Sequence, residues 1–118
     1  MQRSQKDLSQ SVQESIFFQL TTVLADFHKP HDVDEFLRIF LTENEQTALS
    51  KRLAIARMLH LGGSYEEIKK TLNVSTATIA SVAVVLASSG MQKALRKITI
   101  DEWADTIATK VTGFFKSK

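Results

Sequence analysis

A polar segment near the middle of the chain contains the side chains and backbone groups that bind phosphate. Lys69 and Lys70 are adjacent, and Ser75 and Thr76 stand a few residues later, where a helix is expected to begin. Ammonium groups, hydroxyls and the unpaired amides of a helix N-terminus all bind phosphate oxygens. The segment indicates contact with a polyanion, although lysines of this kind also occur on helix faces that contact only solvent.

The charges of the chain are unevenly distributed, although its formal net charge is only +2. Residues 1–45 contain four basic and eight acidic side chains, whereas residues 46–97 contain eight basic and two acidic ones. Residues 98–118 contain three of each. A basic segment of this kind is typical of a nucleic-acid-binding surface, and it coincides with the phosphate-binding candidates.

Residues suited to other chemistry are few. The chain of 118 residues contains no cysteine, which excludes a disulfide scaffold, a thiolate metal site and a cysteine nucleophile. His28 and His31 are separated by Pro30 and lack a further recognisable ligand, so we expect surface residues there and no metal site. No phosphate loop, catalytic serine motif or combination of nucleophile and base is recognisable. We therefore expect a protein that is not an enzyme and holds no cofactor.

The chain has no feature that predicts export or membrane insertion. Residues 1–20 lack the basic start and apolar core of a signal peptide. The longest small or apolar run, 79–87, is about half as long as a membrane span. We expect a soluble, cytoplasmic protein, and the length favours a single domain over residues 1–118.

The elements that must position the phosphate-binding candidates are all predicted to be helices. Apolar residues recur at helical spacing and no alternating strand pattern is present. Capping boxes mark helix starts at Thr42–Glu45 and Ser64–Glu67, and Asp32–Glu35 resembles one. Ser75 is expected to cap the fifth helix, and Thr99–Glu102 the last one. Gly62-Gly63 and Ser88-Ser89-Gly90 mark helix ends. The predicted helices cover about residues 7–28, 32–40, 43–61, 65–72, 76–88 and 100–115.

The two helices at about 65–72 and 76–88 form a helix-turn-helix pattern. Asn73, Val74 and Ser75 provide a turn of the required length, and Asn73 tolerates the left-handed backbone conformation that such a turn needs. Apolar residues stand where the two helices must pack together: Ile68, Leu72, Val74, Ile79 and Val82. Helical hairpins that bind no DNA have the same spacing, so the pattern leaves both interpretations open.

Three segments within residues 34–86 resemble a known family. They are Thr42–Leu59, Gly62–Ile68 with its glycine pair, and the string Ser75-Thr-Ala-Thr-Ile79. They are similar to the Trp repressor superfamily, and most similar to its bacterial Trp-repressor-like proteins of the YerC/YecD type. The resemblance implies an all-α fold of about six helices with a central helix-turn-helix at about residues 64–88. It also implies an intertwined homodimer, formed by helices at about 7–60 and 100–115.

The resemblance further implies a repressor-like transcriptional regulator that binds double-stranded DNA through the helix-turn-helix. The wide apolar face of the first helix, with Phe17, Phe18 and Val23, agrees with a dimer, and an ordinary core is the alternative. Trp103 is expected to anchor the core or the dimer interface. The residues expected to contact DNA are Lys69, Lys70, Ser75, Thr76, Ala77, Thr78, Ala80 and Ser81.

The chain departs from the family at the ligand site. In the Trp repressor the ligand lies between two arginines, of which the first matches Arg52 and the second matches Ser81 here. A neighbouring glycine matches Val82. Without the second guanidinium, half of the stacking and carboxylate-binding group is missing. Arg52 remains a candidate contact for a ligand or a phosphate, and we expect that tryptophan is not a corepressor.

A second departure concerns the expected groove face, formed by Thr76, Ala77, Ala80, Ser81 and Val84. It lacks the Arg, Lys, Asn or Gln side chains that make bidentate contacts with bases. The groups that remain are hydroxyls, which bind phosphates, and small apolar groups, which can contact thymine methyls. Sequence reading through water or DNA shape also stays open.

Binding is therefore expected to be mainly electrostatic and steeply salt-dependent. The basic residues expected to carry it are Lys51, Arg57, Lys69, Lys70, Lys93, Arg96 and Lys97. The alternative function is a helical protein–protein interaction module of the same fold, whose apolar fifth helix docks on another protein. An open surface at Ala80 and Val84, flanked by Lys69 and Lys70, would favour DNA binding.

Overall fold

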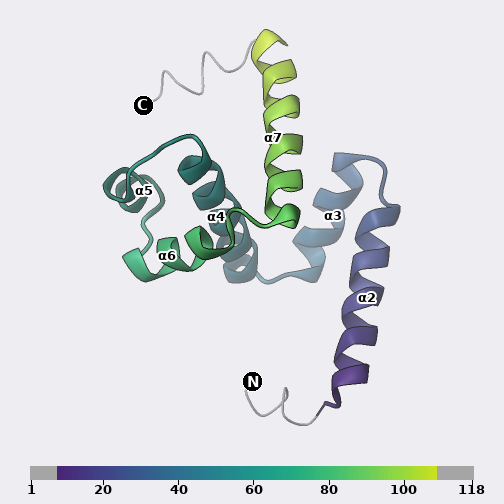
Figure 1. The fold of residues 1–118 in the computed structure, drawn as a ribbon. Helices are drawn as coiled ribbons and strands as arrows, with labels where there is room; N and C mark the ends of the chain where they lie inside the picture. The colour runs from purple at the N-terminus through teal and green to yellow at the C-terminus, as the bar shows by residue number, and fades with distance from the viewer. Residues whose placement is uncertain (1–7, 109–118) are drawn as a thin grey trace. The chain divides into compact units, whose positions relative to one another are not determined.

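The computed structural model describes residues 8–108, and every regular element in this range is an α-helix (Figure 1). The predicted all-α class is confirmed. The chain divides into two compact units, Met1–Gln46 and Thr47–Lys118, called here the N-terminal and C-terminal units.

The N-terminal unit contains α2 (Gln10–Asp26), α3 (Pro30–Phe40) and the first turn of α4 (Glu43–His60). The predicted start of α3 at the Asp32–Glu35 box is wrong. The helix begins at Pro30, and its N-cap residue, Lys29, makes no side-chain capping bond. Proline is favoured at a first helical position because the N–H group that it lacks would have no partner there.

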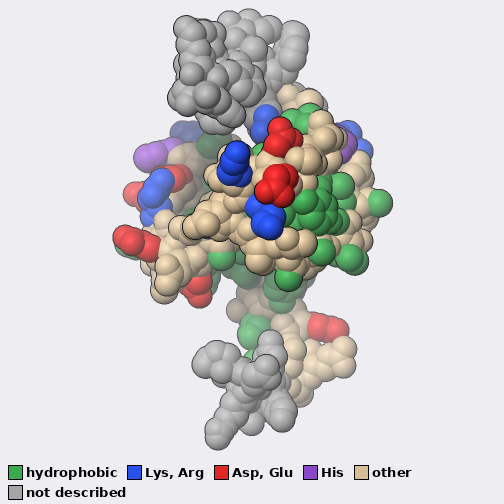
Figure 2. Space-filling view, turned by 90° about the vertical axis from the view of Figure 1, so that its left-hand side faces the viewer, with side chains coloured by type: hydrophobic (Ala, Val, Ile, Leu, Met, Phe, Trp, Pro, Cys, Tyr) green, Lys and Arg blue, Asp and Glu red, His purple; other side chains and the backbone are tan. Residues whose placement is uncertain are grey.

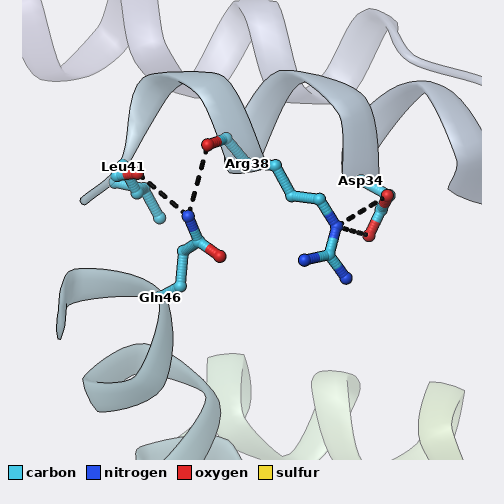
Figure 3. Close-up of polar contacts among 4 residues, drawn as sticks. All are labelled: Asp34, Arg38, Leu41 and Gln46. Atoms are coloured by element: carbon cyan, nitrogen blue, oxygen red, sulfur yellow. Dashed lines mark hydrogen bonds and ion pairs between the residues drawn. The ribbon is translucent and has the colours of Figure 1, made fainter. Parts of the chain in front are cut away.

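Local hydrogen bonds fix the corner between α3 and α4. The Gln46 side-chain amide donates to the carbonyl oxygens of Arg38, at 3.3 Å, and Leu41, at 3.0 Å (Figure 3). The predicted capping box is present, since Glu45 N–H donates to Thr42 Oγ1 and Thr42 N–H donates to Glu45 Oε1. These bonds satisfy backbone groups that the helix ends leave unpaired.

Apolar side chains of the N-terminal unit remain largely exposed. The rings of Phe27, Phe36 and Phe40 contact in series, with centroids 5.6 Å and 4.9 Å apart. Nevertheless neither α2 nor α3 contains a buried residue, and Phe17 and Phe18 are each 68% exposed. This unit therefore holds its helices without a buried core of its own in the described residues.

The C-terminal unit packs α4, α5 (Tyr65–Leu72), α6 (Thr76–Val85) and α7 (Ser89–Ala108) around one cluster. As predicted, Ile68, Ile79 and Val82 are buried, and Leu72 and Val74 pack against them. The remaining buried members are Ile55, Ala56 and Leu95. The α5–α6 pair is thus locked to α4 and α7 by apolar contacts.

The turns of the C-terminal unit agree with the sequence interpretation. Gly62 has φ +90° after α4, and Asn73 has φ +54° between α5 and α6. Ser64 and Glu67 form the predicted capping box of α5. Ser75 caps α6, its hydroxyl accepting a hydrogen bond from Thr78 N–H at 3.1 Å.

The last helix begins earlier than predicted. Thr99 does not cap a new helix, because its hydroxyl donates to the Leu95 carbonyl at 2.9 Å inside α7. The helix instead begins at Ser89, where Ser88 Oγ accepts from Met91 N–H. The fifth predicted helix correspondingly ends at Val85 rather than Ser88. The side chains of residues 100–118, Trp103 included, lie outside the described residues.

Length and apolar composition decide whether a helix can cross a membrane. No single helix among residues 8–108 is long and apolar enough to do so. Thr76–Val85 and Ser89–Thr99 are long and apolar enough only when they are taken together, and these two segments are bent by 101° relative to each other.

The left-handed conformation of Asn73 yields a stability prediction. Asn73→Ala is expected to lower the free energy of unfolding by about 1–2 kcal/mol, because alanine tolerates positive φ poorly. Asn73→Gly should lose little, since glycine adopts this conformation freely. Urea unfolding at one fixed protomer concentration measures both values. Equal stability of Asn73→Ala and the unaltered chain would contradict the prediction.

Candidate nucleic-acid interface

The phosphate-binding candidates lie on the α5–α6 pair. Lys69 and Lys70 are exposed in the last turn of α5, and Ser75 and Thr76 are exposed at the start of α6. Figure 2 looks onto the side where α5 and α6 lie, and Lys and Arg side chains there stand next to Asp and Glu and beside hydrophobic ones. The surface therefore has local positive groups rather than one continuous basic patch.

The start of α6 supplies hydrogen-bond donors for a phosphate. Ser75 satisfies Thr78 N–H and its carbonyl accepts from Ile79 N–H. The amides of Thr76 and Ala77 come before the first residue that can donate within the helix. These two N–H groups, with the positive end of the helix dipole, favour an anion.

The basic residues predicted to bind phosphate differ in their surroundings. Lys51 is half-buried, and its Nζ donates to the carbonyl of Asn73 at 3.3 Å, so it supports the α5–α6 turn. Lys93, Arg96 and Lys97 are exposed on α7. Lys69 and Lys70 are therefore the exposed lysines closest in sequence to the start of α6.

Arg52 and Ser81, the two positions that the resemblance aligns with a pair of ligand-binding arginines, lie together. Arg52 Nη1 donates to Ser81 Oγ at 3.3 Å, and Ser81 Oγ donates to the Thr78 carbonyl at 2.8 Å. Arg52 also lines a hollow of about 200 Å³, whose other walls are apolar: Leu49, Leu53, Val82, Val85 and Met91. The hollow thus has one guanidinium, which already contacts Ser81.

The expected groove face of α6 is open except near its middle. Thr76, Ala77 and Ser81 are exposed, whereas Thr78 and Ala80 are half-buried. Val84 is 82% exposed. The helix places Ala77, Ser81 and Val84 opposite the buried Ile79 and Val82.

Sequence reasoning missed the engagement of the Ser81 hydroxyl. Its contact with Thr78 is local, but its contact with Arg52 joins residues 29 positions apart. No sequence signal indicates that contact, because it depends on how α4 and α6 pack.

Among the described residues, no three His, Cys, Asp or Glu side chains are grouped closely enough to hold a metal ion.

Comparison with known proteins gives two matches. The family model described as Trp repressor protein matches residues 4–99. The chain is also similar to the uncharacterized protein YerC of Bacillus subtilis (strain 168), with 43% identity over 54 residues, 43% of this chain and 52% of the relative. The match therefore spans about half the length of that curated relative. No solved structure matches the chain significantly.

The Arg52–Ser81 arrangement predicts that L-tryptophan does not bind as a specific ligand. The hollow contains one guanidinium and apolar walls. It lacks a second guanidinium, which would help to stack on the indole and hold the carboxylate of the ligand. Isothermal titration of the chain with L-tryptophan should give no saturable heat, with L-leucine as a matched control. Saturable, tryptophan-specific binding that Arg52→Ala abolishes would contradict this prediction.

Proposed function

The chain belongs to the Trp repressor family, and on this premise we propose that it is a repressor-like transcriptional regulator that binds double-stranded DNA as a homodimer. The α5–α6 pair is the DNA-binding element, and α6 is its recognition helix. The observation that carries the proposal is the open face of α6, on which Ala77 and Val84 are exposed, together with the exposed Lys69 and Lys70 in the last turn of α5. Regulation is independent of tryptophan.

Electrostatic contacts supply most of the affinity in this proposal. Lys69 and Lys70 contact phosphates, and the amides at the start of α6 bind another phosphate. Ser75, Thr76 and Thr78 border the same helix start. Because α6 has no Arg, Lys, Asn or Gln, its side chains make no bidentate contact with a base edge.

The homodimer is supported by the apolar surface of the N-terminal unit. A hollow of about 370 Å³ in this unit is lined by Gln13, Ile16, Phe17, Leu20 and Phe40. Phe17, Phe18 and Phe40 are also exposed, and grouped exposed apolar side chains are typical of an interaction surface. A second copy of the chain, presenting the same side chains, would cover it.

Removal of two lysine charges tests the proposed phosphate contacts of Lys69 and Lys70. Lys69→Ala combined with Lys70→Ala should reduce the slope of log affinity against log salt by about 0.9 for each phosphate that is no longer neutralised. The control pair, Lys29→Ala with Arg38→Ala, removes the same charge from the N-terminal unit and should leave the slope unchanged. Fluorescence anisotropy with a duplex of random sequence measures the slopes. Equal slopes for the two double variants would show that Lys69 and Lys70 do not contact DNA phosphates.

Replacement of Phe17 tests the proposed homodimer. Phe17→Glu should convert the dimer to a monomer, because a carboxylate in an apolar interface has no partner there. Phe17→Leu keeps the apolar contact and should remain dimeric. Analytical ultracentrifugation gives the mass, and circular dichroism reports whether the helices persist. A monomeric unaltered chain, or a dimeric Phe17→Glu variant, would contradict the proposal.

A further inference from the structure

The outward face of α6 presents methyl groups, and the hydroxyl of Ser81 in the middle of this face is engaged within the protein. Ala77, Ala80, Ser81 and Val84 follow the spacing of one helix face, opposite Ile79 and Val82. Ser81 Oγ donates its proton to the Thr78 carbonyl and accepts from Arg52. Along this face the methyls of Ala77 and Val84 are exposed and that of Ala80 is half-buried, and the exposed Thr76 stands at its N-terminal edge.

Methyl groups on a recognition helix are suited to contact the apolar group that the major groove offers, the C5 methyl of thymine. Each base pair presents hydrogen-bond donors or acceptors there, and thymine alone among the four bases adds an apolar group, its C5 methyl. Alanine and other methyl-bearing side chains contact that group, whereas guanine and adenine edges are read by Arg, Lys, Asn or Gln, which α6 lacks.

We propose that α6 reads thymine methyl groups in the major groove, with Ala77, Ala80 and Val84 as the specificity-determining residues. This inference rests on the proposed DNA-binding function. From Ala77 to Val84 the helix rises about 10 Å, so the face reaches at most about three base-pair steps. Preferred sites therefore contain a short thymine-rich element for each recognition helix, and affinity depends on its methyl groups.

The test compares DNA with and without the thymine methyl. The full chain is used to select duplexes from two random pools, one prepared with thymidine and one with deoxyuridine, which pairs identically but lacks the methyl. The thymidine pool should yield a thymine-rich consensus and the deoxyuridine pool none. Replacing thymidine by deoxyuridine in the selected duplex should weaken binding about fourfold for each contacted methyl.

A protein variant assigns the effect to α6. Val84→Ser should weaken binding to the thymidine duplex and reduce the further loss caused by deoxyuridine, because the two changes remove the same contact. Ala87→Ser, at an exposed position beyond the end of α6, is the control and should retain the full deoxyuridine effect. Circular dichroism checks that both variants keep their helices.

The outcomes separate the inference from the function on which it rests. If the chain binds no duplex of either pool, the proposed DNA-binding function fails. If it binds thymidine and deoxyuridine duplexes equally, DNA binding stands and methyl reading is overturned. If deoxyuridine weakens binding equally in Val84→Ser and the unaltered chain, Val84 is not a determinant and the assignment to this face is overturned.

Discussion

Burial of six apolar side chains from α4, α5, α6 and α7 fixes the α5–α6 pair, and the candidate interface depends on this packing. Burying an Ile, Leu or Val side chain contributes roughly 1.5–3 kcal/mol, whereas a hydrogen bond contributes about 0.5–1.5 kcal/mol. The cluster therefore outweighs the contacts of Ser81 or Lys51. Once Ile79 and Val82 are buried, helix geometry turns Ala77 and Val84 to the opposite side.

The N-terminal unit is held together in a different way. Its α3–α4 corner is fixed by Gln46 and by the Thr42–Glu45 capping box, bonds that are local in sequence. Such bonds define a turn but cannot replace a core, and Phe17 and Phe18 remain exposed. The proposed homodimer accounts for this contrast, because association would bury the apolar side chains that the single unit leaves in water.

Much of the helix-turn-helix could be predicted from the sequence because its signals are local. The Ser64–Glu67 box, the tolerance of Asn73 for positive φ and the Ser75 cap each act within a few residues. The starts of α3 and α7 were predicted wrongly, since capping-type residues there lie inside helices that begin earlier. Thr99 illustrates the reason, because a threonine hydroxyl can donate to a carbonyl in the preceding turn as well as cap a helix.

The candidate site was predictable in composition but not in detail. The lysines and the absence of base-reading side chains on α6 are visible in the sequence. The engagement of Lys51 with the Asn73 carbonyl and of Arg52 with Ser81 depends on packing between distant segments. These contacts leave a face that is poorer in free polar groups than the sequence suggests.

Amide NMR of the isotope-labelled full chain, titrated with duplex DNA, tests whether the α5–α6 pair binds DNA. We expect the largest shift changes at Lys69, Lys70 and residues 75–81. Changes confined to α2 and α3, or no change at the start of α6 while DNA is bound, would contradict it.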